Sequence, residues 1–380
     1  MNGSRKGRSE SRKFRLTALA LACIVPLGLG ELALRLARFD PYAAMRSGRG
    51  EFLRPSDIPG VHYELRPGAT GPAWGTRVAV NSDGFRGEEL DPVRRDRVRI
   101  LVIGDSIAFG NRLAEGLEFP ARLRTLLLDR LDSVEVLNLA VTGYDTVQEV
   151  AALEARLEAL DPDWVVLQYC LNDAGVHTVN LDFTTKMRRL ERAGIFHLRI
   201  VQFFVQRLDG LHQAESVALQ NDPERFRAEY AALIDPIAAD ETTLRSMMAA
   251  ASSEWPSSWY RDEARVGRIR HAFQRLAELS VEHEFGVLAL VVPGLATSAG
   301  SPTHRVAEEI VSLELARAGL EEIDVRVEFG SVGLLSLRLD PDDPIHPGAK
   351  GHEILARAIA DGIVHAVSMR ANAFPFEPPI

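Results

Sequence analysis

The sequence predicts a three-layer α/β fold, in which helices cover both faces of a central parallel sheet. From Val98 onward, short apolar runs rich in β-branched residues alternate with longer segments of helical periodicity, and this alternation is typical of a parallel sheet between helices. The 380 residues, 46% of them hydrophobic, suffice for one substantial core with insertions or for two small domains. With only two cysteines, Cys23 and Cys170, the fold does not depend on a disulfide framework.

The N-terminal residues predict a membrane anchor. Residues 1–15 contain six Lys and Arg residues against one Glu, and residues 16–36 form an apolar stretch that is interrupted only late, by Glu31 and Arg35. A basic cluster before an apolar run of about 20 residues orients a spanning helix with its N-terminus in the cytoplasm. We therefore expect a basic cytoplasmic tail over 1–15, a single-pass transmembrane signal anchor over 16–36, and the remaining chain outside the cytoplasm.

Three other interpretations of this segment stay open. The uninterrupted apolar part, from Leu16 to Gly30, has only fifteen residues, a length that also suits a cleaved signal peptide, although no small-residue cleavage site follows it. Cys23 follows Ala-Leu-Ala, which is weakly reminiscent of a lipid-attachment site. The segment could also be a buried amphipathic helix of the domain.

Residues 37–97 are expected to connect the anchor to the domain. Residues 40–75 are rich in Pro, Gly and Arg, which is typical of a juxtamembrane linker, here one that packs partly on the domain. The alternating residues 76–81, followed by the turn-forming Ser82-Asp83-Gly84, predict a β-hairpin.

The domain itself is predicted over 98–370, and a polar, irregular and helical insertion at about 174–255 interrupts its alternation. Within the insertion, the apolar patch 195–205 is expected to pack as core against the sheet, with a substrate lid or a membrane-facing surface as the alternatives. The expected strands are 98–103, 134–139, 164–170, 286–292 and 323–327, and the expected helices are 119–131, 144–160, 266–284, 303–318 and 350–367.

Charge and composition argue against several functions. The formal net charge is −9, and after residue 40 the sequence shows no basic face for a nucleic acid. The ten histidines are scattered, and no pair of Cys or His residues has the spacing of zinc ligands. No Gly-Lys-Ser or Gly-Lys-Thr follows the first strand, which argues against a nucleotide-binding P-loop. We therefore expect no metal, no cofactor and no nucleic-acid partner.

The first predicted strand ends in Gly104-Asp105-Ser106, which places a serine hydroxyl at the carboxyl edge of the sheet, where ligands of such folds gather. A serine becomes an effective nucleophile only with a base beside it and a group that orients the base. The proline-stiffened loop before the last helix supplies both, because Asp343 and His346 are three residues apart. Asp340 and Asp342 lie close enough in the sequence to replace Asp343 as the orienting acid.

Two further strand ends carry groups that can stabilise an oxyanion. Gly143 follows the second strand and can turn its backbone N–H toward the site, and Asn172 follows the third strand and can offer its side-chain amide. Gly143 could also be a plain turn glycine. The neighbouring Asp105 and Asp173 are expected to hold their loops through hydrogen bonds to backbone amides.

These residues resemble the four sequence blocks of the SGNH hydrolases, also called the GDSL esterase and lipase family. The blocks are Gly104-Asp105-Ser106, Gly143, Asn172 and Asp343-Pro344-Ile345-His346, and they occur in the family's order. The resemblance covers roughly residues 98–175 and 285–367. It implies a flavodoxin-like α/β/α sandwich, a triad of Ser106, His346 and Asp343, and an oxyanion hole formed by the amides of Ser106 and Gly143 with the Asn172 side chain.

Two positions depart from the family pattern. Ile107 stands where the family name has leucine, and Cys170 stands where the third block usually begins with glycine. The Cys170 position puts the local geometry of the loop that carries Asn172 in question. Ahead of the nucleophile strand, residues 81–87 resemble a hairpin found in membrane-anchored bacterial members of the family.

The resemblance implies a serine ester hydrolase that works through an acyl-enzyme. With the resemblance to membrane-anchored bacterial members, the expected location is the periplasm or another place outside the cytoplasm of a bacterium. This location favours O-acyl esters, in particular acetyl esters, of cell-envelope or extracellular carbohydrate as the substrate. One alternative is an O-acyltransferase that uses the same triad to acylate a polysaccharide. The other, from a different class, is a catalytically silent binding or assembly module. The expected partners are an acyl-ester substrate and, through the N-terminal helix, the membrane, while the sequence does not indicate the oligomeric state.

Overall fold

The computed structural model describes residues 3–39, 52–91, 97–175, 198–204, 207, 242–253, 256–295 and 302–373. The chain divides into two compact units. The first unit comprises Met1–Arg46 and Asp182–Ser216, and the second comprises Ser47–Leu181 and Val217–Ile380. All the residues of the predicted site therefore belong to the second unit.

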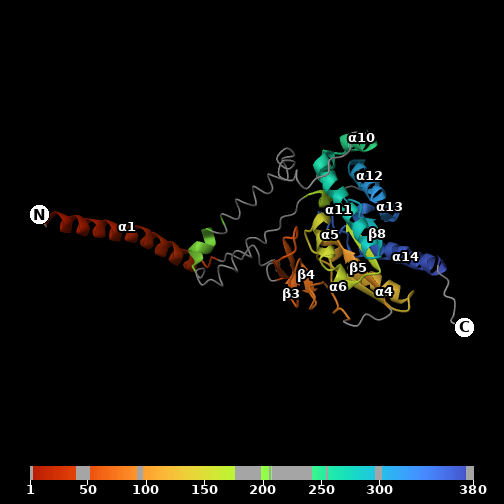
Figure 1. The fold of residues 1–380 in the computed structure, drawn as a ribbon, viewed down its shortest axis with the longest axis horizontal. Coiled ribbons are helices and arrows are strands. Elements are labelled where there is room, and N and C mark those ends of the chain that lie inside the picture. The colour runs from red at the N-terminus through yellow and green to blue at the C-terminus, as the bar shows by residue number, and fades with distance from the viewer. Residues whose placement is uncertain are drawn as a thin grey trace. The chain divides into compact units, whose positions relative to one another are not determined.

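The first unit is built on the long helix α1 (Gly3–Leu36), drawn in red in Figure 1. The predicted tail and the predicted anchor thus lie on one continuous helix, and Pro26, Glu31 and Arg35 fall within its C-terminal part. Within the described residues, no helix combines the length and the apolar character that crossing a membrane requires. The transmembrane helix expected at 16–36 is therefore not found there, and the location of the protein stays a prediction.

The described part of the insertion's apolar patch, residues 198–204, belongs to the first unit and contacts the C-terminal end of α1. The Ile200 backbone N–H donates to Glu31 Oε2 at 2.9 Å. The rings of Phe39 and Phe203 also meet edge to face, with centroids 5.6 Å apart. The expected packing of this patch against the sheet stays a prediction. Most of the predicted insertion lies outside the described residues.

The second unit contains a five-stranded parallel sheet. Its strands are β5 (Val98–Ile103), β6 (Val134–Asn138), β7 (Trp164–Tyr169), β8 (Gly286–Val291) and β9 (Glu321–Asp324). They lie in the order β6-β5-β7-β8-β9, with every pair parallel. Counted along the chain this is the 2-1-3-4-5 order of flavodoxin-like folds. The expected fold class is confirmed for this unit.

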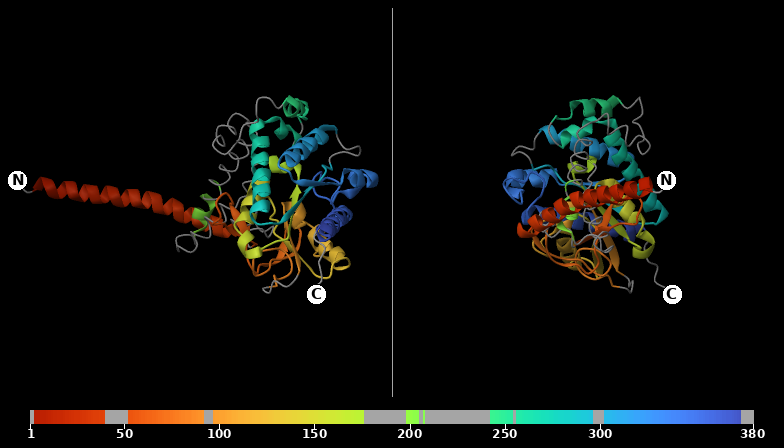
Figure 2. Two further views of the ribbon diagram at one scale, coloured as in Figure 1. Left: turned by 45° about the vertical axis from the view of Figure 1, so that its right-hand side comes forward. Right: turned by 90° about the vertical axis from the view of Figure 1, so that its left-hand side faces the viewer.

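Both faces of the sheet are covered, as the apolar runs of the strands predict. Ile100 and Val102 of β5 point into one core, while Leu101 and Ile103 point into the other, and all four are buried. Figure 2 (left) shows the sheet between the teal and the dark blue helices. One face carries α4 (Phe119–Leu128) and α14 (Ala349–Ala373), and the other carries α5 (Thr146–Glu154), α11 (Glu263–Glu282) and α12 (Pro302–Arg317).

Most element boundaries agree with the expected ranges to within about three residues, but α14 ends at Ala373 instead of at residue 367. The helix expected at 144–160 is two helices, α5 and α6 (Leu157–Leu160). The chain tightens between them, because the Arg156 backbone N–H bonds to the Leu153 carbonyl, only three residues back. The second unit also contains α10 (Thr242–Ala250), α13 (Arg326–Val332) and the 3₁₀ turns η2 (Leu171–Ala174), η4 (Ser257–Arg261) and η5 (Leu334–Leu337).

Residues 52–91 form part of the domain core, although the sequence suggested a linker. They form two small antiparallel sheets, β1 (Leu53–Pro55) with β2 (Tyr63–Leu65), and β3 (Thr70–Ala73) with β4 (Thr76–Ala79). Tyr63 and Trp74 are buried in the same core as α4 and α14. Proline and glycine made this segment resemble a linker, but here they serve tight turns between very short strands.

The predicted hairpin is present in part. The strand 76–79 pairs backward with β3 rather than forward, while the Ser82-Asp83-Gly84 turn is closed by a single bridge between Val80 and Arg86. Asn81 holds this turn, since its side-chain Oδ1 accepts the backbone N–H of Phe85 at 2.8 Å. The turn thereby delivers Arg86 to the interior of the domain.

Candidate active site

The candidate nucleophile Ser106 begins the short helix α3 (Ser106–Phe109), directly after β5. Gly104 makes the turn between them, and a Cβ at this position would lie 2.7 Å from Gln168 Oε1 and 2.8 Å from Ala108 Cβ. Only glycine therefore fits without moving its neighbours. Gln168, a buried residue of β7, accepts the Ala108 backbone N–H at 2.9 Å. Together these contacts fix Ser106 at the carboxyl edge of the sheet, as expected.

The other end of α3 is held by a buried cation that the sequence analysis did not assign. The Arg86 guanidinium donates to the carbonyls of Phe109, Gly110 and Leu113, the last two at 2.8 and 3.3 Å. It also lies over the Phe109 ring, 4.9 Å from its centroid. Carbonyls at a helix C-terminus carry partial negative charge, which a cation stabilises. The residues Asn81 to Gly87 thus support the helix that carries Ser106.

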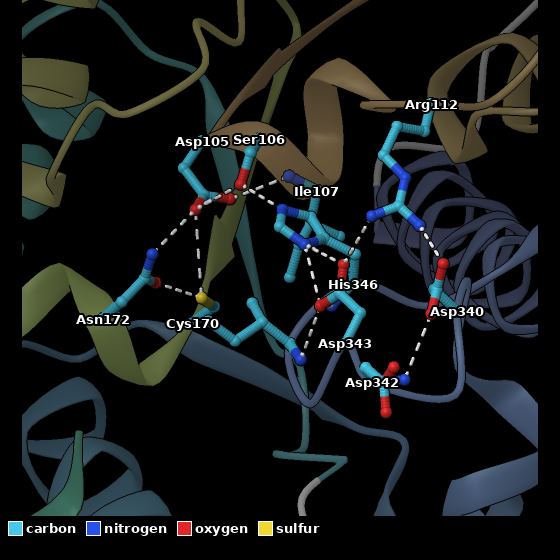
Figure 3. A network of polar contacts seen from close by, with 11 residues as sticks. Asp105, Ser106, Ile107, Arg112, Cys170, Asn172, Asp340, Asp342, Asp343 and His346 are labelled. Atoms are coloured by element: carbon cyan, nitrogen blue, oxygen red, sulfur yellow. Dashed lines mark hydrogen bonds and ion pairs between the residues drawn. The ribbon is translucent and has the colours of Figure 1, made fainter. Parts of the chain in front are cut away.

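The loop before α14 brings the candidate base to Ser106. His346 Nε2 lies 2.8 Å from Ser106 Oγ, and His346 Nδ1 lies 2.9 Å from Asp343 Oδ2 (Figure 3). Because the carboxylate accepts the Nδ1 proton, Nε2 is left to accept the serine proton. Ser106 Oγ is also 3.1 Å from Asp105 Oδ2, but its single proton serves one acceptor at a time. The three residues expected to form a triad are therefore in contact.

The Asp343 carboxylate is fixed by its own loop. Its Oδ1 accepts the backbone N–H groups of Ile345 at 3.1 Å and His346 at 3.0 Å. Partial burial opposes ionisation, but the hydrogen bonds from the His346 side chain and backbone outweigh it and hold the pKa of Asp343 well below its usual range. The carboxylate is therefore ionised throughout the pH range in which such an enzyme works.

The two other acids of the loop do not contact the imidazole. Asp340 Oδ1 accepts the Asp342 backbone N–H at 3.1 Å, and Asp340 Oδ2 pairs with Arg112 at 3.0 Å. Arg112 comes from the segment after α3 and also reaches Asp343 Oδ2, at 3.4 Å. The sequence analysis missed Arg112, because nothing in the sequence relates residue 112 to a loop more than 220 residues further on. The guanidinium joins the nucleophile segment to the loop of the base (Figure 3).

The oxyanion candidates lie at the ends of β6 and β7. Asn172 Nδ2 is 3.4 Å from Asp105 Oδ2, the oxygen that also contacts Ser106 Oγ. The Cys170 thiol contacts the other end of the amide, Asn172 Oδ1, so that the nitrogen faces Asp105. Cys170, which stands where the family pattern has glycine, thus contacts the amide directly. Gly143, with φ at 82°, lies in a turn after β6 whose Val141 N–H donates to the Gly104 carbonyl at 3.1 Å.

A group of buried acids lies behind these loops. Asp105 Oδ1 accepts the Ile107 N–H at 2.9 Å and Asp173 Oδ2 accepts the Cys170 N–H at 3.2 Å, in line with their expected structural role. One atom each of Asp105, Cys170 and Asp173 that could ligate a metal ion lies within 4.8 Å of the other two. The two carboxylates, however, already accept the backbone hydrogen bonds that shape their loops. Burial, and then the neighbouring acids Asp173 and Asp105, raise the pKa of Glu149 well above its usual range.

Comparison with known proteins identifies the family. The model of the GDSL-like lipase/acylhydrolase family matches residues 102–354. No curated protein matches the sequence. Among solved structures, the chain is similar to LAE5, an alpha/beta hydrolase enzyme from the metagenome of Lake Arreo, Spain, with 15% identity over 70% of this chain and 96% of that chain and a TM-score of 0.40.

Two other similar structures are an acetylxylan esterase and TesA. The chain is 16% identical to Axe2, an acetylxylan esterase from Geobacillus stearothermophilus, over 70% of this chain and 93% of that chain, with a TM-score of 0.38. It is 15% identical to TesA over 70% of this chain and 97% of that chain, with a TM-score of 0.40.

The family match spans well over half of the chain and contains every residue predicted for the site. The chain belongs to the GDSL-like lipase/acylhydrolase family, also called the SGNH hydrolases, and it is a carboxylic ester hydrolase.

Proposed function

We propose that the protein hydrolyses short O-acyl esters, acetyl esters above all, with Ser106, His346 and Asp343 as its catalytic triad. The observation that carries the proposal is the continuous line of hydrogen bonds from Ser106 Oγ through the imidazole to the Asp343 carboxylate, at 2.8 and 2.9 Å. A nucleophile, a base and an orienting acid in this geometry are what acyl transfer by a serine requires. Membership of an acylhydrolase family supports the same reaction.

In the first half of the proposed reaction, His346 Nε2 takes the proton of Ser106 while Oγ attacks the ester carbonyl carbon. Asp343 keeps the proton on Nδ1, and its negative charge stabilises the imidazolium. When the tetrahedral intermediate collapses, the imidazolium gives its proton to the leaving alcohol oxygen, and the acyl group remains on Ser106. In the second half, His346 takes a proton from water, which attacks the acyl carbon. The bond from that carbon to Ser106 Oγ then breaks, the imidazolium returns its proton to Oγ, and the carboxylic acid and the free serine result.

The negative charge that forms on the carbonyl oxygen needs hydrogen-bond donors. The proposed donors are the backbone N–H groups of Ser106 and Gly143 and the Asn172 side-chain nitrogen. The position of that nitrogen beside Asp105, which itself touches Ser106, supports its part in the set. The left-handed conformation of Gly143, in a turn bonded to Gly104, supports the contribution of its amide.

We propose cell-envelope or extracellular carbohydrate as the alcohol portion of the ester. This part of the proposal rests on the basic and apolar N-terminal sequence, which favours a place outside the cytoplasm, where O-acylated polysaccharides are found.

Hydrolysis of 4-nitrophenyl acetate by the purified full chain tests the reaction. We expect turnover that falls at least about 10³-fold in Ser106→Ala, because the nucleophile is lost. A folded protein that cleaves no acyl ester would contradict the proposal and favour a silent binding module. Addition of a polysaccharide should not accelerate turnover; faster turnover with acetylated polymer as the product would show transfer to carbohydrate instead of hydrolysis.

Substitutions within one loop test the role of the acid. Asp343→Asn should lower kcat by about 10⁴-fold, as loss of the acid from a serine triad does. Asp342→Asn is the matched control, since it removes a carboxylate from the same loop that does not touch the imidazole, and it should leave kcat within about threefold of wild type. Equal losses in the two variants would mean that Asp343 acts only by shaping the loop.

A further inference from the structure

A small hollow lies at the carboxyl ends of β7 and β8, beside the segments that carry Ser106 and His346. Ile107, which follows the nucleophile, and Ile345, which precedes the base, both line it, and so does Asn172. The hollow thus borders each of the three loops that carry the proposed catalytic groups. Its remaining walls include Cys170, Leu171, Pro293, Gly294, Pro344 and His304.

Size and lining together indicate which part of an ester fits there. The cavity volume is about 20 Å³, which is room for about one water-sized group. A methyl group is of this size, whereas a sugar ring is several times larger and would need polar partners for its hydroxyls. Most of the lining is apolar, with the Asn172 amide and the His304 ring as the main polar groups. The hollow therefore suits the acyl side of the ester better than the alcohol side.

We propose that this hollow, here named the acyl pocket, receives the hydrocarbon end of the acyl group and restricts the enzyme to chains of about two or three carbon atoms. The inference rests on the proposed function, because it assumes that Ser106 is the residue that becomes acylated. It goes beyond that function by assigning the group that sets the length of the acyl chain.

His304, from the first turn of α12, is the wall that sets this limit. Its ring is held on two sides: Nδ1 lies 3.2 Å from the hydroxyl of the buried Ser257, and a Cβ on Gly294 would come within 2.3 Å of His304 Cδ2. The ring therefore already rests on the Gly294 backbone. Only 6% of the residue is exposed, so the packed neighbours of the imidazole oppose its displacement by a longer chain.

A series of 4-nitrophenyl esters from acetate to octanoate tests the proposal on the full chain, because only the acyl group changes. We expect kcat/KM to be highest for acetate and at least about tenfold lower for butanoate, since each methylene that a pocket cannot accept costs about 10-fold or more. Octanoate cleaved as well as acetate would overturn the acyl pocket and leave the proposed function intact. No cleavage of any ester, or equal cleavage by Ser106→Ala, would refute the proposed function instead.

Substitution of His304 tests the residue assignment. His304→Ala should raise the ratio of butanoate to acetate cleavage at least about tenfold, because the wall is removed. His304→Asn, which keeps a polar atom for Ser257, should raise the same ratio by a smaller factor and guards against a folding defect in the alanine variant. Unchanged ratios in the folded variants would overturn the assignment of His304.

A matched control enlarges a different cavity. Leu153 is fully buried and lines a separate hollow beside Ile103 and Gly104, on the side of α5. Leu153→Ala should lower stability without a change in the ratio of butanoate to acetate cleavage. The same change in ratio in this variant would show that general loosening of the domain, and not the acyl pocket, governs chain length.

Discussion

The buried histidine of α14 makes the stability of the domain depend on pH. His352 is 1% exposed, and its Nδ1 accepts the backbone N–H of Phe119, the first residue of α4, at 3.0 Å. Burial, followed by the positive charges of Arg122 and other neighbours, lowers the pKa of His352 to about 3. The imidazole is therefore neutral in the folded protein over the whole range in which a free histidine titrates.

The size of the effect follows from proton linkage. Below its ordinary pKa of 6.5 the histidine of the unfolded chain binds a proton that the folded protein does not bind, so acidification favours unfolding. Between pH 7.5 and 5.0 this one group should remove about 2 kcal/mol from the free energy of unfolding. The loss continues down to about pH 3, where the folded form also takes up the proton.

Urea denaturation at pH 7.5 and at pH 5.0, followed by tryptophan fluorescence, measures this contribution. His352→Gln should be less stable at both pH values but should lose about 2 kcal/mol less than wild type between them, because glutamine does not titrate. His271→Gln, at an exposed position, is the control and should keep the dependence of wild type. Equal losses in wild type and His352→Gln would refute the argument that His352 stays neutral when the protein folds.

Three further variants test how the site is held. Gly104→Ala places a Cβ 2.7 Å from Gln168 Oε1. The variant should lower kcat about 100-fold, because the turn that carries Ser106 is displaced. A kcat within threefold of wild type would show that the turn accommodates the methyl group. Cys170→Ala removes the contact to the Asn172 amide and should lower kcat about 10-fold with little change in KM. Cys170→Ser, which keeps a hydrogen-bonding group, should restore kcat. Equal kcat in the two variants would show that the thiol contact has no part in catalysis. Arg86→Met leaves the carbonyls after α3 without a donor and should cost about 3 kcal/mol or more in chemical denaturation, so an unchanged denaturation midpoint would contradict its role.

The sheet could be predicted from the sequence because its strands are buried on both faces. A strand such as β7, buried at all six positions, gives a run of apolar residues that only Gln168 interrupts, and few other structures explain such a run. The same signal was missing for residues 52–91, because their strands of three or four residues are too short to show a period.

The candidate site could be predicted where its chemistry is local in the sequence. Asp343 and His346 lie in one turn, and their contact follows from a spacing of three residues. The supporting groups could not be predicted, because Arg86, Arg112 and Gln168 act on backbone or loops far from them in the sequence. Arginine and glutamine at these positions look like ordinary polar residues until the fold brings them to α3 and the loop of the base.

The contact between Ser106 and His346 is the central claim, and covalent labelling tests it most directly. A fluorophosphonate should add to one residue of the full chain, and peptide mass spectrometry should place the adduct on Ser106. The adduct should be absent in Ser106→Ala and should form at least about 100-fold more slowly in His346→Ala, because the hydroxyl then lacks its base. Labelling of another residue, or labelling of His346→Ala at the rate of wild type, would contradict this account.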